Sequence, residues 1–239
     1  MTPSTALDQN EPSILTKIDR RSLKGAAVDQ IRTAILRGEL KPGERITELG
    51  LAKTLGVGQA TIREALIELE HQGFIQRGTP RKTYVTALSQ QDIKEMYLVR
   101  IRLELLAVEL LAAEKGKDLS ECERAFQGME EAARKGKVPE FIQEDLNFHR
   151  KLWQSAGNRS LVDLLERLVP RLFAFFIIRS PDPSRQSMLE GARQHGHLLQ
   201  LLKEGKEKEA KVVMQESMQQ ARSEDLRISR RNSHSSKRL

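Results

Sequence analysis

The chain has 239 residues, of which 38% are hydrophobic and 31% charged, and its formal net charge is +7. It contains one cysteine, Cys122, which excludes an intrachain disulfide. No apolar run is long enough to span a membrane or to act as an N-terminal signal, so we expect a cytoplasmic protein with no membrane partner.

The positive charge is unevenly distributed along the chain. Residues 1–90 carry 13 Lys/Arg and 10 Asp/Glu, residues 91–221 carry 21 of each, and residues 222–239 carry 6 and 2. A basic unit attached to a neutral body is typical of a polyanion reader joined to a part with another task.

The N-terminal third is predicted to begin with a disordered tail, residues 1–20, which mixes prolines, serines, threonines and charges of both signs. A helix is expected over residues 23–37, and residues 40–45, which include Pro42 and Gly43, then form a turn. A short helix and a tight turn at residues 56–58 follow. The next helix has apolar residues at i, i+3, i+4, i+7 spacing: Ile62, Ala65, Leu66 and Leu69.

Two short strands are predicted after this helix, Phe74-Ile75 and Tyr84-Val85, around a basic tip. Helix, turn, helix and hairpin in this order indicate a winged helix-turn-helix over residues 21–88. Its second helix is expected to enter the major groove while cationic groups contact phosphates. The candidate DNA-binding residues are Arg45, Gln59, Thr61, Arg63, Arg77, Gly78, Arg81 and Lys82. The alternative is a winged helix that contacts protein, with these charges solvated.

Only helices are predicted after residue 88. Ser89 and Asp92 are suited to start the first, which extends to about residue 115. Others are expected at about 119–135, between Pro139 and Gly157, after Asn158, at 184–203 and at 207–228. Residues 89–228 therefore form an all-helical bundle, residues 229–239 a disordered basic tail, and the fold class is mainly α.

One group of side chains in the bundle is suited to metal binding. Asp145 and His149 are four residues apart on one helix face, and His195 lies on a later helix. One carboxylate and two imidazoles can hold a divalent transition metal. The alternative for Asp145 and His149 is an ion pair or a hydrogen bond.

The stretch KPGERITELGLAKTLGVGQATIREALIELEHQGFIQRG, within residues 23–87, resembles the N-terminal domain of GntR-family bacterial transcription regulators. It departs from the family pattern at three places. Gly58-Gln59-Ala60-Thr61 replaces the usual Ser-Arg-Thr-Pro, Leu49 replaces a frequent arginine, and the wing tip is Pro80-Arg81-Lys82 instead of glycine-rich. The resemblance implies DNA binding, and these changes leave the operator sequence open.

Residues 90–222 resemble the FCD-type effector domain found on one branch of that family, through residues 98–104, 145–149, 157–158 and His195 before Gly205. The resemblance implies that an aspartate and three histidines hold a metal of the Zn or Ni type. Asp145, His149 and His195 map onto three of these ligands, whereas the fourth position is Ser217. A weaker metal site or none is thus the alternative.

The same resemblance assigns Arg100, and with it Asn158, to the binding of a small organic acid. A bidentate contact from Arg100 to an effector carboxylate is one interpretation, and a salt bridge to Glu104 on the same helix face is the other.

The combined interpretation is a homodimeric transcription regulator that acts as a repressor. It reads a near-palindromic double-stranded DNA operator and responds to a small carboxylic-acid metabolite. Two alternatives stay open. One is a metal-dependent hydrolase or oxygenase that uses Asp145, His149 and His195; the other is an architectural DNA binder with a degenerate bundle.

Overall fold

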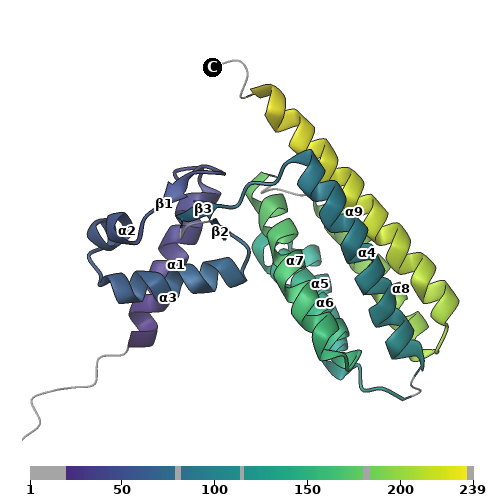
Figure 1. The fold of residues 1–239 in the computed structure, drawn as a ribbon. Helices are drawn as coiled ribbons and strands as arrows, with labels where there is room; N and C mark the ends of the chain where they lie inside the picture. The colour runs from purple at the N-terminus through teal and green to yellow at the C-terminus, as the bar shows by residue number, and fades with distance from the viewer. Residues whose placement is uncertain (1–19, 79–81, 114–115, 180–183, 236–239) are drawn as a thin grey trace, which may run out of the picture.

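The computed structural model describes residues 20–78, 82–113, 116–179 and 184–235, and it contains two units (Figure 1). The first unit, hereafter the head, begins with α1 (Arg20–Leu36). It continues with β1 (Arg45–Ile46), α2 (Glu48–Leu55), α3 (Gln59–His71), β2 (Ile75–Gly78) and β3 (Lys82–Val85). The predicted winged helix-turn-helix is confirmed. Of the predicted tail, residues 1–19 lie outside the described residues, and Arg20 already belongs to α1.

The sheet of the head has three strands in the order β1-β3-β2, all antiparallel. The prediction that residues 40–45 form only a turn is wrong at its end, because Arg45 pairs with Tyr84 and Ile46 with Thr83. Two residues are too few to show a period-2 pattern, so this strand gives no signal in the sequence. The buried Ile46 adds to the core of the head.

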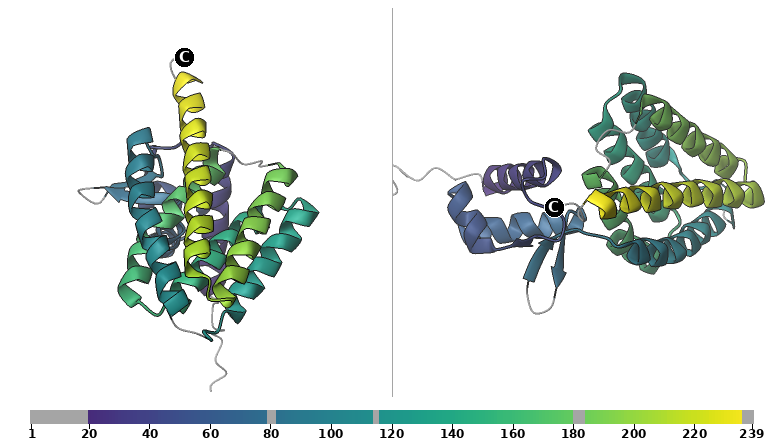
Figure 2. Two further views of the ribbon diagram at one scale, coloured as in Figure 1. Left: turned by 90° about the vertical axis from the view of Figure 1, so that its right-hand side faces the viewer. Right: turned by 90° about the horizontal axis from the view of Figure 1, so that it is seen from above.

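The second unit, hereafter the bundle, comprises six described helices, as predicted. They are α4 (Gln90–Ala113), α5 (Ser120–Lys135), α6 (Val138–Ser155), α7 (Arg159–Arg179), α8 (Arg185–Lys203) and α9 (Glu207–Ser235). Each packs on two neighbours in the closed order α4-α9-α8-α5-α6-α7-α4. Figure 2 shows this arrangement from above, with the head beside it. A closed ring of helices can enclose a site at its centre.

The helix boundaries follow local chemistry. Ser89 and Asp92 form the predicted reciprocal cap of α4: the Asp92 amide donates to Ser89 Oγ at 3.1 Å, and the Ser89 amide donates to Asp92 Oδ2 at 2.8 Å. The prediction that the last helix ends near Ile228 is wrong, because α9 continues to Ser235. The basic composition beyond Ile228 suggested a tail, but arginine is a good helix former and no glycine or proline interrupts the helix there. Residues 236–239 lie outside the described part.

The head rests on the bundle through α7. Ala174 of α7 is buried in the head core, and Ile177 and Ile178 pack against that core. Arg171 donates to Gln76 of β2 at 3.0 Å. None of the described helices combines the length and the apolar character that crossing a bilayer requires.

Candidate functional site

The outward edge of α3 carries the candidate base-reading residues. The predicted buried face is confirmed, because Ile62, Ala65, Leu66 and Leu69 are all buried. This orientation leaves Gln59 and Arg63 exposed and Thr61 half-buried near the start of the helix. Side chains at the N-terminal end of such a helix are those that reach base edges in a helix-turn-helix.

Arg63 is held by a carboxylate from the neighbouring helix. Its Nη2 donates to Glu48 Oε2 at 2.8 Å, and its Nε donates to Glu48 Oε1 at 3.1 Å. The hydrogen bond from Arg63 lowers the pKa of Glu48. Both side chains are open to solvent, 60% exposed for Arg63 and 33% for Glu48. Because an exposed ion pair is weak, a phosphate or a base can replace Glu48 as the partner of Arg63.

The candidate residues of the wing differ in their exposure and in whether they are paired with an acid. Arg45 is exposed on β1, and Lys82 is half-buried at the start of β3. Arg77 on β2 is bound to Glu70 of α3 at 2.9 Å. Arg81 lies outside the described residues.

The ring of bundle helices surrounds a cavity of about 540 Å³. Its walls come from α4, α6, α7, α8 and α9, so residues from distant parts of the chain meet there. Arg100, Asp145, His149 and His195 line this cavity, as does Ser217. The structure therefore brings together the candidate metal ligands and the candidate effector arginine.

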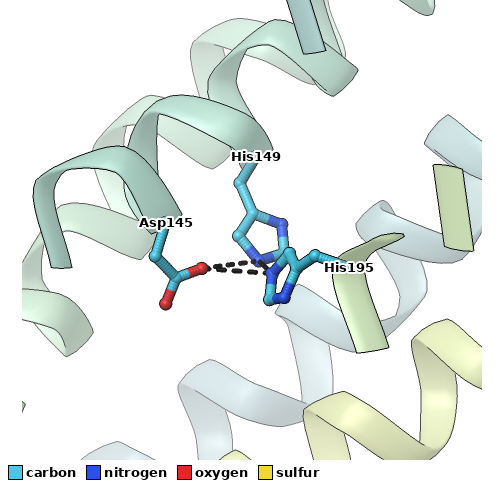
Figure 3. A group of neighbouring side chains, drawn as sticks. All are labelled: Asp145, His149 and His195. Atoms are coloured by element: carbon cyan, nitrogen blue, oxygen red, sulfur yellow. Dashed lines mark hydrogen bonds and ion pairs between the residues drawn. The ribbon is translucent and has the colours of Figure 1, made fainter. Parts of the chain in front are cut away.

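Asp145, His149 and His195 point toward one another across the cavity wall (Figure 3). His195 Nε2 lies 3.1 Å from Asp145 Oδ1 and 3.3 Å from His149 Nε2. His149 Nε2 lies 3.7 Å from Asp145 Oδ1. Both histidines are buried, so these three polar atoms converge on one point away from bulk water.

The two other ring nitrogens face acceptors. His195 Nδ1 lies 2.7 Å from the Gly191 carbonyl oxygen, and His149 Nδ1 lies 3.4 Å from Glu104 Oε1. With a proton on each Nδ1, both Nε2 lone pairs would be available to a metal ion beside Asp145; without a metal, a proton on His195 Nε2 pairs it with Asp145. A histidine with its second nitrogen on a carboxylate or a backbone carbonyl is oriented as metal-binding histidines are.

Glu104 connects this group to Arg100. It is fully buried, accepts from Trp153 Nε1 at 2.8 Å, and accepts from Arg100 Nε at 3.2 Å. Burial opposes its ionisation, but His149, Arg100 and Trp153 outweigh that cost and lower the pKa of Glu104 to about 2. The predicted salt bridge between Arg100 and Glu104 is therefore present.

The charges of the group are set by mutual contact. Burial opposes the ionisation of Asp145, yet the facing His195 lowers the pKa of this carboxyl overall. For His195 burial also opposes the charged form, and Asp145 raises the pKa of the imidazole above its usual value. The two groups thus stabilise each other as a charged pair.

Comparison with known proteins decides what this combination of units is. Residues 23–85 match the model of the bacterial regulatory proteins of the gntR family, and residues 95–220 match the FCD domain. The chain belongs to the GntR family and carries an FCD domain. It is a DNA-binding transcriptional regulator, and membership in this family sets the enzyme alternative aside.

The similar proteins are transcription regulators, and the similarity extends over most of their length. The HTH-type regulator YdhC of Bacillus subtilis is 33% identical over 206 residues, which cover 75% of this chain and 92% of YdhC. The probable D-xylose utilization operon transcriptional repressor of Paenarthrobacter nicotinovorans is 28% identical, with 70% of this chain and 74% of that protein covered. The structure of E. coli McbR/YncC shares the fold, with a TM-score of 0.66, 22% identity, and coverage of 86% and 97%.

The donor set of this GntR-family regulator fits a metal ion. Asp145 Oδ1 is buried and accepts no hydrogen bond, so it is a polar atom that a metal ion could bind. In a tetrahedral zinc site with bonds of about 2.0–2.1 Å, ligand atoms stand about 3.3 Å apart, close to the distances found here. Ser217 lines the cavity at the position that the family resemblance gives to a fourth ligand, and a serine hydroxyl is a poor ligand for such metals.

Asn158 does not take the predicted effector role in this placement. It is not among the residues that line the cavity, and its Oδ1 accepts from the Leu161 amide at 3.0 Å. Asn158 thus caps α7, the helix that the sequence predicts to begin after it.

Sequence reasoning missed several polar residues of the cavity, among them Tyr97 and Asp225. A signal for Asp225 existed: Met214, Met218, Ala221 and Asp225 follow one another at spacings of four, three and four residues. An acid on the buried stripe of a helix indicates a polar group inside the bundle.

Proposed function

We propose that this regulator is a homodimeric repressor whose affinity for its operator is controlled by a small carboxylate bound in the bundle cavity. The observation that carries the proposal is that α7 belongs to both units. Leu172, Phe173 and Phe176 line the cavity, while Ala174 and Ile177, on the same stretch of helix, lie in or against the head core. A ligand that moves this stretch must also move the head.

The contact between α7 and the head is tight enough to transmit such a movement. Gly73, two residues before the start of β2, lies against Pro170, and a Cβ on Gly73 would stand 2.3 Å from the Pro170 carbonyl oxygen. Arg171 binds Gln76 in the same region. Effector binding then changes operator affinity to the extent that the effector prefers one placement of the head over another.

Gln59, Thr61 and Arg63 are the proposed base-reading residues, with Arg45, Arg77, Gly78, Arg81 and Lys82 near the DNA backbone. Gln59 can make paired hydrogen bonds to adenine, and Arg63 can exchange Glu48 for guanine or a phosphate. Repression is supported by what is known of a relative, the Paenarthrobacter repressor named above.

An arginine substitution with a matched control tests the DNA-reading role. The probe is duplex DNA from upstream of the protein's own gene, with binding followed by fluorescence anisotropy. Arg63→Ala is expected to weaken binding at least tenfold. Arg193→Ala removes an equally exposed arginine that is also paired, to Glu190 at 3.1 Å, but on the bundle, and should leave binding unchanged. Equal affinities for the two variants would contradict the assignment of α3.

The proposed carboxylate would be held by Arg100, with a divalent metal on Asp145, His149 and His195 supplying a second positive centre when bound. A screen of small carboxylic acids, with and without a chelator, tests this by thermal shift and by anisotropy on the same operator DNA. A true effector raises the melting temperature and changes operator affinity in parallel. An architectural DNA binder would show neither effect.

Homodimerisation is proposed through the outer face of α4 and its neighbour α7. Leu98, Val99 and Leu106 on α4 and Leu164 on α7 are exposed, with Leu98 at 64% and Leu164 at 54%. Leu98 and Leu106 are two helical turns apart and share a face. Exposed apolar side chains grouped on adjacent helices favour contact with a second copy. Leu98→Glu with Leu164→Glu should yield a monomer in analytical ultracentrifugation, and a dimer that survives both changes would exclude this face.

A further inference from the structure

The cavity contains a buried acid that neither metal binding nor an organic acid explains. Asp225 of α9 is 3% exposed and lines the cavity wall. The hydroxyl of Tyr97, on α4, donates to its Oδ2 at 2.8 Å. Burial raises the pKa of Asp225 to about 7, so this carboxyl is costly to keep charged where it stands.

Two arginines line the cavity, and both are already paired. Arg227 donates to Glu224 at 2.6 Å, and both of these side chains are largely exposed, whereas Arg100 is buried. Among the described residues Arg100 is the single buried arginine or lysine. Its Nε binds Glu104, and its guanidinium lies over the rings of Tyr97 and Phe173, at 5.6 Å and 5.4 Å from their centroids. Arg100 lowers the pKa of Asp225 as well as that of Asp145, so it interacts with carboxyls of both groups.

The charge balance of the cavity therefore limits what can bind. Arg100 faces three carboxyls, of Glu104, Asp145 and Asp225. A metal ion on Asp145 and the histidines would offset two negative charges. While Asp225 is ionised, a ligand that brings only another carboxylate would leave one negative charge in the cavity uncompensated. A ligand that also brings an ammonium or a hydroxyl would give Asp225 a hydrogen-bond donor and remove that cost.

A purely structural role for Asp225 is the competing explanation. The bond between Tyr97 and Asp225 joins α4 to α9, which pack on each other. A carboxamide in place of the carboxyl would make the same bond without a buried charge. A ligand-binding role requires an ionisable group on the cavity wall. A contact between two helices requires neither the charge nor that position.

We propose that Asp225, positioned by Tyr97, makes this regulator select carboxylates that carry a hydrogen-bond donor, an ammonium or a hydroxyl, over unsubstituted carboxylates. The inference rests on the proposed function, because it assumes that the cavity binds a carboxylate. The carboxylate would face Arg100 and the metal site, and the donor would face Asp225 on α9.

Matched sets of acids test the inference on the full-length protein. Each set keeps one carbon skeleton and varies one group: propanoate, lactate and alanine; succinate, malate and aspartate; glutarate, 2-hydroxyglutarate and glutamate. Binding is measured by isothermal titration calorimetry and by thermal shift. Within a set that binds, the amino or hydroxy acid is expected to bind at least tenfold more tightly than the unsubstituted acid. Whether the amino acid or the hydroxy acid binds more tightly then identifies the preferred donor.

Two substitutions separate recognition from helix packing. Asp225→Asn keeps the shape of the side chain and the acceptor for Tyr97. It should reduce the preference for the amino or hydroxy acid over the unsubstituted acid at least tenfold, while the unsubstituted acid binds as before. Tyr97→Phe removes the bond between the helices but keeps the carboxyl, so it should lower the melting temperature and retain most of the preference. If Asp225→Asn does not fold, the matched sets on the unmodified protein remain decisive.

Equal binding of substituted and unsubstituted acids, or a preference that persists in Asp225→Asn, would overturn the inference and leave the proposed function intact. Binding of no acid in any set would overturn both. A preference lost in Asp225→Asn but kept in Tyr97→Phe supports the inference as stated.

Discussion

Two of the regulator's arginine–glutamate pairs lie in opposite surroundings. In the head, Arg63 and Glu48 meet at 2.8 Å in solvent. In the bundle, Arg100 and Glu104 meet at 3.2 Å and are almost completely buried. Water screens the first pair, so its partners can be exchanged at little cost. The second pair is surrounded by aromatic rings and a histidine, so neither member can leave without stranding the other.

The comparison shows where each region keeps its charge. The head keeps its charges where DNA can reach them, and its fold depends on an apolar core that contains none of them. The bundle places its charges at the centre of its ring, where they can hold a metal or an acid and where the fold depends on their being paired. Equivalent substitutions in the two regions should therefore have unequal consequences.

Removing the buried glutamate is expected to have the largest effect on stability. Glu104→Leu leaves the guanidinium of Arg100 buried without its partner, which costs about 3–5 kcal/mol. For a chain of this size the melting temperature should fall by about 10 °C. Glu48→Leu removes the equivalent partner of the exposed Arg63 and should shift the melting temperature by no more than about 2 °C. Circular dichroism on heating measures both variants.

The double variant Arg100→Met with Glu104→Leu sharpens this result. Replacing both members of a buried pair by apolar residues is often neutral, so part of the lost stability should return. Recovery would be incomplete, because Trp153 also donates to Glu104. If Glu104→Leu and Glu48→Leu melted at the same temperature, the contrast between the two pairs would be wrong.

The junction between the regions can be broken at a single glycine. Gly73 and Gly38 have nearly the same backbone conformation, with φ of 78° and 74°, so alanine strains both equally, by about 1 kcal/mol. Around Gly38 there is open space, whereas a Cβ on Gly73 would collide with the backbone of Pro170 and Arg171. Gly73→Ala should therefore cost about 2 kcal/mol more than Gly38→Ala in urea unfolding. Equal costs would mean that the head does not rest on α7 as described.

The sequence allowed much of the head to be predicted, because its signals are local. Apolar spacing in α3 and the glycine turn before it fix the helix-turn-helix within a few residues. The strand at Arg45–Ile46 was not predicted, because it is defined by its partners in β3, about 38 residues away, and not by its own sequence pattern. The end of α9 escaped because a basic composition fits a helix and a tail equally well.

The site in the bundle was predictable only in part. Asp145 and His149 share a helix face, and that is legible in the sequence. The meeting of Glu104 with His149 and of Tyr97 with Asp225 depends on how the ring of helices closes, which no local pattern records. Asn158 shows a limit of the family resemblance, which assigned it to effector binding, whereas in the structure it caps α7.

The pH dependence of stability should reveal the buried Asp225. Its pKa is about 7 in the folded protein and about 4 in an unfolded chain, so the folded state binds a proton more tightly. The stabilisation is complete below about pH 4 and is lost as the pH rises to about 7. Relative to Asp225→Asn, the unmodified protein should lose about 2 kcal/mol between about pH 5.5 and pH 8, measured by urea unfolding. A difference that does not change with pH would show that Asp225 titrates normally.

A change of modest size is expected from restoring the fourth metal ligand. Ser217→His adds an imidazole to the cavity that Asp145, His149 and His195 also line. If it reaches the metal, Zn²⁺ or Ni²⁺ should bind at least tenfold more tightly, or about 1.4 kcal/mol. Chelator-stripped protein is titrated with each metal by calorimetry. The titration is run near pH 8, because the raised pKa of His195 makes protons compete with the metal at lower pH.

A second serine of the cavity supplies the control for that titration. Ser187→His places an imidazole on the cavity wall at α8, at a position that the family pattern does not assign to a ligand, and should leave metal affinity unchanged. Adding His149→Ala to Ser217→His should remove the gain, since the new ligand acts only together with the others. If Ser217→His and Ser187→His bound metal alike, Ser217 would not face the metal position. Any metal would then be held by Asp145, His149 and His195 without a contribution from α9.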